Sequence, residues 1–466
     1  MILRNWQSKC VAIALDRFRK KQKHFMVLAT PGAGKTIMAA SLAKKLFEDD
    51  LIDFVVCFAP SVSVQTSMQE TFSRVLAQPM HGKLGAAGGV FTYQYLTSSK
   101  NADWSFLKNT RVLAVFDEIH HCGGQDVELA NAWGREVLMT ISNNASYIMA
   151  MTGTPWRTDQ TPISLARYIE PDYNIQLDYA YTLAEAIRDN VCRLPEIVLI
   201  DNDNLIVKQK SFTSLSAAID QSDLQYGKIL NDSGALKYAL SLGVSKLAKV
   251  REEQPDAAGL IVASSVEAAI RIRDMLTNKL QQTAVLVTYK ENNPQEIIEA
   301  FRTSNVQWIV SVAMVSEGTD IPRLRVCVHL SNVRTELFYR QVLGRILRQM
   351  ANIQNRIAYF ITFAEQSMID FTKRLKQDVP KVVVRHDLCE TKKNSAQSSS
   401  NTSSDGESDS QPDNVDDGKS DSQPDNVNDG NNWQAEKKQQ DEQNQPAPLV
   451  IFRLQGQYRQ QVFSIF

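Results

Sequence analysis

The stretch Ala29-Thr-Pro-Gly-Ala-Gly-Lys-Thr36 lies between an expected strand at Phe25–Ala29 and an expected helix at Thr36–Glu48. This is the setting of a phosphate-binding loop, in which glycines let the backbone turn so that its N–H groups face a phosphate. The N-terminus of the following helix adds a partial positive charge. The stretch therefore predicts a nucleotide-binding α/β domain at the start of the chain.

Two side chains of this loop have distinct expected roles. Lys35 would reach the β- and γ-phosphates, and the Thr36 hydroxyl would be a ligand of Mg²⁺. Ala29 stands where the general pattern has its first glycine, which the end of a strand tolerates. A chance Gly-Lys-Thr turn is the alternative, and the strand–helix setting disfavours it. The expected nucleotide contacts of the loop are Pro31, Gly32, Ala33, Gly34, Lys35 and Thr36.

A pair of carboxylates, Asp117 and Glu118, follows the apolar run Val112–Phe116. Beside a phosphate loop, a carboxylate at the end of a strand can hold Mg²⁺, and a second one can polarise the attacking water. We assign the first role to Asp117 and the second to Glu118. Such a pair alone usually marks a solvated turn, but the loop upstream favours catalysis. The adjoining His-His-Cys has no second ligand pair at suitable spacing, which disfavours zinc.

Short apolar runs alternate with longer amphipathic stretches from residue 1 to about residue 385. Runs of this length, bounded by turn residues, are typical of buried parallel strands. The repetition predicts two α/β sheets, in domains 1–200 and 201–388, with Pro195 and the polar stretch Asp201–Lys210 near the junction. The expected strands are Phe25–Ala29, Phe54–Ala59, Val112–Phe116, Ile148–Met151, Leu260–Ala263, Ala284–Val287, Trp308–Val312 and Val326–Leu330.

The charge is unevenly distributed, although the whole chain of 466 residues carries only −1. Residues 396–445 hold twelve acidic and three basic side chains, a net charge of −9 that leaves +8 on the rest. They belong to a region, 389–448, that we expect to be a disordered acidic linker, because low hydrophobicity cannot offset the entropy of ordering. It contains a 12-residue direct repeat, Ser408–Lys419 and Ser420–Asn431. A basic body leaves a polyanionic partner open.

The last residues, 449–466, become apolar again. An apolar segment at the end of a long flexible linker is typical of a docking segment, which binds a protein partner or the chain's own body. A terminal strand that completes a domain is an equally good interpretation.

Several classes of protein are excluded by what the sequence lacks. No apolar run approaches the roughly 18–20 residues that span a bilayer, so no membrane partner is expected. The first residues show no signal pattern. The six cysteines are scattered without a Cys-x-x-Cys pair, which favours a reduced, cytoplasmic protein, associated with the nucleoid if it is bacterial.

A third group of chemical side chains lies in an expected amphipathic helix at Glu336–Met350. Gln341, Arg345 and Arg348 are spaced i, i+4 and i+7, so they would share one helix face. Two arginines presented together suit a triphosphate, because each guanidinium offers a planar fork of donors. A salt-bridged surface face is the alternative.

These elements, in this order, resemble the superfamily 2 helicases and translocases over about residues 1–385. The resemblance implies two tandem RecA-like domains with ATP and Mg²⁺ between them, and Lys35, Glu118, Gln341, Arg345 and Arg348 as catalytic residues. Gln7, in Leu3-Arg-Asn-Trp-Gln7, matches the adenine-reading glutamine. The other matching motifs are Phe58-Ala-Pro-Ser-Val-Ser63, Val90-Phe-Thr-Tyr-Gln94, Thr152-Gly-Thr-Pro-Trp-Arg157, Leu260-Ile-Val-Ala-Ser-Ser265 and Val315-Ser-Glu-Gly-Thr-Asp-Ile-Pro322.

The same motifs assign further contacts by resemblance. Gly318 and Asp320 would touch the nucleotide. The expected nucleic-acid contacts are Pro60, Ser61, Thr92, Ser264 and Thr319.

The details of the motifs favour DNA over RNA as the substrate. Asp-Glu-Ile-His followed by His-Cys, with Thr-Gly-Thr-Pro-Trp-Arg, is similar to the DNA-directed branch, which includes repair helicases and restriction-enzyme motor subunits. The expected function is an ATP-dependent DNA helicase or translocase. Without a nuclease signature or an accessory wedge domain, strand separation is less supported than ATP hydrolysis.

Three alternatives remain open at this point. The protein could translocate on duplex DNA without unwinding it, or be the motor subunit of a restriction or phage-defence complex that docks through residues 449–466. It could also be a nucleic-acid-binding module with a silent ATPase, against which the intact Lys35, Glu118, Arg345 and Arg348 argue.

Overall fold

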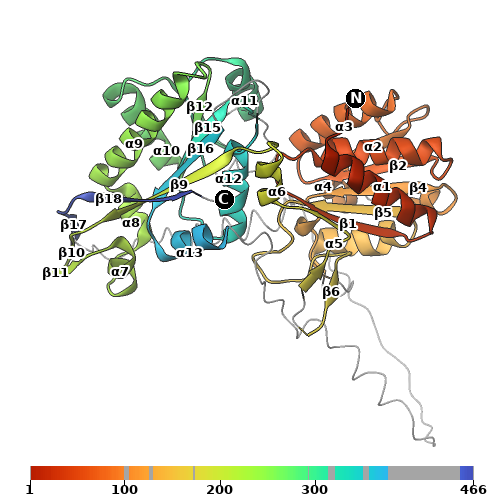
Figure 1. Cartoon of the computed structure of the whole chain (residues 1–466), viewed down its shortest axis with the longest axis horizontal. Helices are drawn as coiled ribbons and strands as arrows, with labels where there is room; N and C mark the ends of the chain where they lie inside the picture. Colours follow the sequence, from red (N-terminus) through yellow and green to blue (C-terminus); the bar gives the residue numbers. More distant parts are fainter. Residues whose placement is uncertain are drawn as a thin grey trace, which may run out of the picture.

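A computed structural model of the chain describes residues 2–98, 104–124, 130–171, 174–291, 293–312, 321–349, 356–375 and 452–464. These residues form two α/β bodies that lie next to each other, with the N-terminal body in red and orange and the second body in green to blue (Figure 1). Among them, no helix is long and apolar enough to cross a membrane.

The first body is built on a parallel sheet whose six described strands follow the order β3-β2-β4-β5-β1-β8. Its strands are β1 (His24–Ala29), β2 (Phe54–Ala59), β3 (Gly88–Thr92), β4 (Val112–Asp117), β5 (Tyr147–Thr152) and β8 (Tyr179–Tyr181). Its helices include α1 (Asn5–Arg19), α2 (Lys35–Glu48), α3 (Val62–Leu76), α4 (Tyr93–Ser98), α5 (Ala132–Glu136) and α6 (Leu183–Arg188). A short hairpin, β6 (Arg167–Ile169) and β7 (Asn174–Gln176), extends from this body.

The second body holds a sheet whose seven described strands follow the order β13-β14-β12-β15-β16-β9-β18. All of its neighbouring strands are parallel except the edge strand β18. The strands are β9 (Leu194–Asn202), β12 (Ala258–Ala263), β13 (Ala284–Val287), β14 (Trp308–Ser311), β15 (Leu324–Leu330), β16 (Ile357–Phe363) and β18 (Tyr458–Ser464). The helices include α7 (Leu215–Asp220), α8 (Tyr226–Asn231), α9 (Ser233–Arg251), α10 (Val266–Asp274), α11 (Pro294–Thr303), α12 (Glu336–Ile346) and α13 (Gln366–Arg374).

The α/β class with two parallel sheets, predicted from the alternating pattern, is confirmed. Each of the eight expected runs is a strand in one of the two sheets, within two residues at either end. The central strands are buried on both faces: every residue of β4 and β12 is buried. Such strands need continuous apolar runs, which is why the sequence displays them so plainly.

The chain passes from one body to the other between Cys192 and Arg193. The backbone N–H of Cys192 donates to Ala186 of α6, whereas that of Arg193 donates to Leu347 in the second body. The expected boundary at residues 200 and 201 therefore falls inside β9, a strand of the second sheet. Pro195 was expected to mark the domain junction, but it lies within β9, near its start. Proline is tolerated there, because the pairing of β9 with β18 begins only at the next residue, Glu196.

The C-terminal segment is part of the second body, where β18 lies along β9 in Figure 1. β18 pairs antiparallel with the whole length from Glu196 to Asn202, and the preceding β17 (Phe452–Leu454) pairs with β10 (Leu205–Val207). β10 also pairs with β11 (Lys210–Phe212). The Tyr458 ring stacks on Tyr238 at 4.3 Å. Of the two interpretations of residues 449–466, the structure realises the strand that completes a domain. The acidic region 389–448 lies outside the described residues.

Candidate active site

The phosphate loop connects β1 to α2 at the carboxyl edge of the first sheet, and α2 begins at Lys35. Gly32 and Gly34 have positive φ values of 81° and 94°, so the loop takes a path that favours glycine. The N-terminal segment holds this loop from outside. Arg4 Nη1 donates to the Ala33 carbonyl at 2.7 Å, and Gln7 Nε2 donates to the Gly34 carbonyl at 2.9 Å.

Gln7 is therefore placed at the nucleotide loop, as its motif implies, but in contact with the loop's own backbone. Its Oε1 accepts the backbone N–H of Arg4 at 2.9 Å, and its side chain is buried. Adenine recognition by Gln7 stays a prediction. Arg4 was not expected in the site, although it lies inside the same motif, three residues before Gln7.

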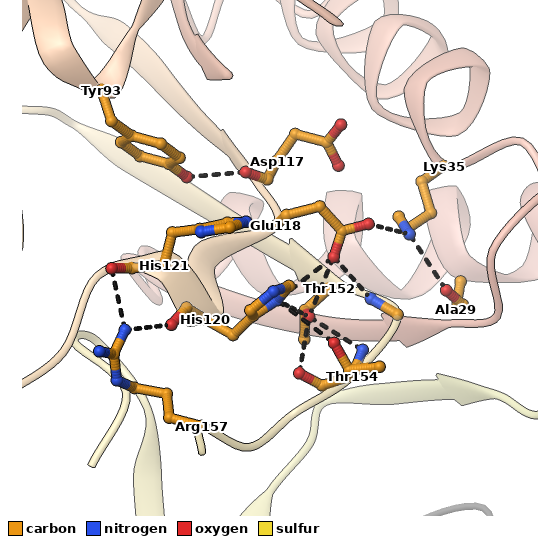
Figure 2. Close-up of polar contacts among 11 residues, drawn as sticks. Ala29, Lys35, Tyr93, Asp117, Glu118, His120, His121, Thr152, Thr154 and Arg157 are labelled. Atoms are coloured by element: carbon orange, nitrogen blue, oxygen red, sulfur yellow. Dashed lines mark hydrogen bonds and ion pairs between the residues drawn. The ribbon is translucent and has the colours of Figure 1, made fainter. Parts of the chain in front are cut away.

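Glu118 lies opposite the loop and has the most contacts of the acidic pair (Figure 2). One carboxylate oxygen accepts from Lys35 Nζ at 2.8 Å. The other accepts the backbone N–H of Gly153 at 3.0 Å and lies 3.2 Å from the Thr152 hydroxyl. Lys35 at the start of α2, Thr152 at the end of β5 and Gly153 just after it thus meet at one carboxylate, that of Glu118 just after β4.

The backbone at Glu118 is unusual, because φ is 50° at a residue that is not glycine. Residues other than glycine rarely adopt this φ. Those that do often lie at functional sites, where contacts with neighbouring residues hold the strained backbone in place. Here the Tyr93 hydroxyl donates to the Asp117 carbonyl at 2.8 Å. Arg157 donates to the carbonyls of His120 at 2.6 Å and His121 at 2.9 Å (Figure 2). Neither Tyr93 nor Arg157 was singled out from the sequence, although both belong to quoted motifs.

The electrostatic environment separates the two carboxylates. Burial alone would raise the pKa of Glu118, but Lys35 and His120 outweigh it and hold that pKa well below its usual value. Burial, and then the charge of Glu118, raises the pKa of Asp117 to about 6, with Lys35 acting in the opposite direction. Glu118 therefore keeps its negative charge to a lower pH than Asp117 does.

Asp117 fits the expected Mg²⁺ ligand. Its side chain is buried, and its Oδ1 has no hydrogen-bond partner among the described residues. A buried carboxylate oxygen without a partner is disfavoured unless a cation or water satisfies it. Carboxylate and hydroxyl oxygens are also the ligand types that Mg²⁺ accepts. Thr36, the second expected ligand, lies in the first turn of α2.

The second body reaches the phosphate loop through α12 and the residues after it. A Cβ on Gly344 would lie 2.8 Å from the Pro31 Cβ, so the lack of a side chain lets α12 pack directly on the loop. A Cβ on Gly32 would lie 2.9 Å from the Arg348 Cγ. Arg348 and the loop are thus in contact across the two bodies. A narrow pocket beside them is lined by both, including Thr30, Pro31, Gly344 and Leu347.

The expected single helix face for Gln341, Arg345 and Arg348 is wrong in its last member. Gln341 and Arg345 lie four residues apart on α12, but the helix ends at Ile346. Arg348 instead forms an antiparallel bridge with Cys192. The backbone N–H of Arg193 donates to the Leu347 carbonyl at 2.7 Å. The residues that follow α12 therefore pair with the linker and do not continue the helix.

The expected nucleic-acid contacts fall into two groups. Pro60 and Ser61 follow β2, and Thr92 ends β3, opposite Ala59 in the register of the two adjacent strands. Ser264 is buried after β12 in the second body. The contacts assigned to Gly318, Thr319 and Asp320 lie outside the described residues.

Comparison with known families supports this arrangement from the sequence side. Residues 1–157 match the family model described as type III restriction enzyme, res subunit, and residues 243–350 match the helicase conserved C-terminal domain. The two models occur in the order of the two bodies. The chain belongs to the superfamily 2 helicases. Membership in this superfamily implies ATP binding and an ATP-hydrolysing enzyme, and the match to the res subunit relates the chain to restriction-enzyme subunits.

Several proteins are similar to this superfamily 2 chain over most of its length. An uncharacterized protein of Mycobacterium leprae (strain TN) is 28% identical over 364 residues, which cover 74% of this chain and 59% of that protein. An uncharacterized protein of Mycobacterium tuberculosis (strain ATCC 25618 / H37Rv) gives the same identity and shares. The DNA 3'-5' translocase XPB2 of Sulfurisphaera tokodaii is 23% identical, and the match covers 74% of this chain and 79% of the translocase. The chain thus spans about three fifths of the mycobacterial relatives.

Solved structures show the same fold. The ATP-dependent type ISP restriction-modification enzyme LlaBIII, bound to DNA, has a TM-score of 0.55 at 15% identity, covering 81% of this chain and 30% of its own. A fragment described as an HsdR subunit of a type I restriction enzyme from Vibrio vulnificus YJ016 has a TM-score of 0.56 at 15% identity, covering 80% and 66%. The two bodies of this helicase-family chain are RecA-like domains.

Proposed function

We propose that the protein is an ATP-driven motor that moves on DNA. One observation carries this proposal: α12 and Arg348 of the second domain contact the phosphate loop of the first. A site built from both domains changes whenever the domains move. Hydrolysis in such a site is therefore coupled to domain motion, which is what a translocating enzyme needs.

The first domain would provide phosphate binding and water activation. In this structure Lys35 is paired with Glu118. A phosphate at the loop would compete for the Lys35 ammonium, which would release Glu118 to orient the attacking water. When bound, Mg²⁺ would neutralise phosphate charge, with Asp117 and Thr36 as its expected ligands. The Glu118 carboxylate would keep its orientation because Gly153 and Thr152 still hold its second oxygen.

The second domain would act on the transition state. Charge spreads over the transferred phosphoryl oxygens, and a planar guanidinium stabilises it better than a point charge does. Arg345 and Arg348 are the candidates for this role, with Gln341 on the same face of α12 as Arg345. These residues would act most when the domains close.

The chain's relatives favour DNA as the polymer along which the motor would move. The archaeal relative is named a DNA 3'-5' translocase, and the type ISP enzyme is described as bound to DNA. Pro60, Ser61 and Thr92 lie together at two adjacent strand ends, and Ser264 occupies a strand end in the other domain. Contacts in both domains would let the motor grip the phosphate backbone in alternation. The charge of +8 outside residues 396–445 agrees with this.

A second candidate is the motor subunit of a restriction or phage-defence complex that translocates on duplex DNA without unwinding it. It is favoured by the match of residues 1–157 to the res subunit of type III restriction enzymes. Docking through residues 449–466 is less favoured, because β17 and β18 already pair within the second domain.

The decisive experiment compares ATP hydrolysis with single-stranded DNA, duplex DNA, branched DNA and RNA in parallel. We expect DNA to stimulate hydrolysis at least about tenfold more than RNA does. Strand displacement and triplex displacement, measured on the same preparation, then separate a helicase from a duplex translocase. Equal rates with and without every nucleic acid would contradict the motor proposal.

A further inference from the structure

The linker between the domains contains a buried arginine whose contacts are unusual. The Arg193 side chain is fully buried, and its guanidinium donates to three backbone carbonyls. The acceptors are Leu324 at 2.7 Å, Ile346 at 3.0 Å and Pro322 at 3.0 Å. Burial, followed by the nearby charge of Arg325, lowers its pKa to about 9. Burying a charged group costs free energy, so a buried arginine held by three carbonyls indicates a specific role.

The three carbonyls belong to parts of the second domain that carry the predicted chemistry. Ile346 is the last residue of α12, so its carbonyl lacks a helical partner and attracts a cation. Pro322 closes the motif that contains Gly318 and Asp320. Arg193 therefore ties the linker to the end of the arginine helix and to the end of a nucleotide motif.

The neighbouring linker residue faces the other domain. The backbone N–H of Cys192 donates to Ala186 of α6 at 3.0 Å, and its thiol lies 3.7 Å from the carbonyl of Pro31 in the phosphate loop. Cys192 also forms the bridge with Arg348. The peptide between Cys192 and Arg193 is thus the point at which the phosphate loop, the linker and the arginine segment meet.

We propose that Arg193 is a positioning residue that makes the linker and the arginine segment move as one unit, so that domain closure delivers Arg345 and Arg348 to the phosphate loop. This inference rests on the proposed motor function and adds a part to it. Without the three-carbonyl clamp, α12 would keep its fold, but its end would no longer follow the linker. The arginines would then reach the loop with the wrong geometry in a larger fraction of closures.

The test compares Arg193→Lys with Arg323→Lys. Arg323 is a matched control, because it is also buried in the second domain and donates to backbone carbonyls. Its acceptors, in Asp256, Phe301 and Val306, belong neither to the linker nor to α12. Lysine keeps the charge in both variants but cannot reproduce the planar fork.

We expect Arg193→Lys to lower DNA-stimulated kcat by about tenfold and to change the KM for ATP by less than about threefold. Arg323→Lys should keep kcat within about twofold of the parent value. The two variants should lower the unfolding temperature by a similar amount. Measurements are made below both unfolding transitions. Equal losses of kcat in the two variants, or a loss in neither, would overturn the inference.

A second readout separates this inference from the motor proposal. Nitroxide labels at the exposed positions Glu70 in α3 and Lys249 in α9 report the distance between the domains. With a non-hydrolysable ATP analogue and Mg²⁺, we expect one narrow distance distribution in the parent chain and a broadened one in Arg193→Lys. If the parent chain shows no stimulated hydrolysis, the motor proposal fails, and the distance distributions still decide the role of Arg193. Identical distributions in parent, Arg193→Lys and Arg323→Lys would exclude it.

Discussion

The two halves of the candidate active site are built in different ways. In the first domain, Lys35, Glu118 and Gly153 are joined by direct hydrogen bonds at the carboxyl ends of adjacent strands. In the second domain, α12 touches the phosphate loop through Gly344, and Arg348 lies beyond the end of the helix. The first half is pre-organised by one sheet, whereas the second depends on where the linker places it.

This difference separates two kinds of contribution to catalysis. A group fixed by its own sheet acts whenever nucleotide is bound, so its loss should remove hydrolysis under all conditions. A group delivered by another domain acts when the domains close, so its loss should mainly remove the response to nucleic acid. Substitutions in the two halves should therefore differ in how their effect on turnover depends on DNA.

Glu118→Gln should reduce ATP turnover by about 100-fold or more, with and without DNA. The amide keeps the reach of the side chain but removes the carboxylate that orients water. ATP binding, measured at equilibrium, should survive. Glu48→Gln, at an exposed position at the end of α2, is the control and should be near the parent. Near-normal turnover in Glu118→Gln would remove Glu118 from its assigned role.

Arg348→Ala should reduce DNA-stimulated turnover by about 10- to 100-fold, while ATP binding without DNA changes much less. Arg348→Lys should rescue little, because an ammonium cannot replace the planar fork. Arg19→Ala, on the exposed surface of α1, serves as the control. Full stimulation in Arg348→Ala would show that the segment after α12 does not complete the ATP site.

Thr152→Ala should reduce turnover by about three- to tenfold. The Thr152 hydroxyl lies 3.2 Å from Glu118 and 2.8 Å from the His120 ring, so its loss loosens the base without removing it. Thr152→Ser keeps the hydroxyl and should recover most of the activity. If serine and alanine behave alike, the lost methyl group and not the hydrogen bond explains the effect.

Removal of residues 449–466 should lower the unfolding temperature of the second domain by about 5 °C or more, because β9 loses the strand that covers its edge. Differential scanning calorimetry with and without the segment measures this shift. Turnover below the new transition should stay within about threefold of the parent. A loss of hydrolysis without any change in unfolding temperature would assign the segment to catalysis instead.

Removal of residues 396–445, with β17 and β18 kept, should tighten DNA binding by about two- to fivefold at low salt. The deletion removes a net charge of −9 that competes with DNA for the basic body. Fluorescence anisotropy should show the gain shrinking as salt is added, since salt screens exposed charges. Equal affinities at both salt concentrations would leave the acidic region as a tether.

The fold class and the first half of the site can both be predicted from local patterns in the sequence. Buried parallel strands need continuous apolar runs, so β4 and β12 were visible without a structure. Chemistry that depends on adjacent residues was equally visible, because the loop before α2 and the acidic pair after β4 are local patterns. The carboxyl ends of parallel strands share one edge, which predicts that the two patterns meet.

The placement of the second half depends on contacts between distant parts of the chain, which local patterns do not report. Helical spacing placed Arg348 on α12, but pairing with the linker at Cys192 ends the helix at Ile346. The domain junction, the strand addition of β18 and the clamp formed by Arg193 all depend on partners that are distant along the chain. Periodicity reports which face of an element is buried, but it carries no information about which distant carbonyl or strand edge lies against that face.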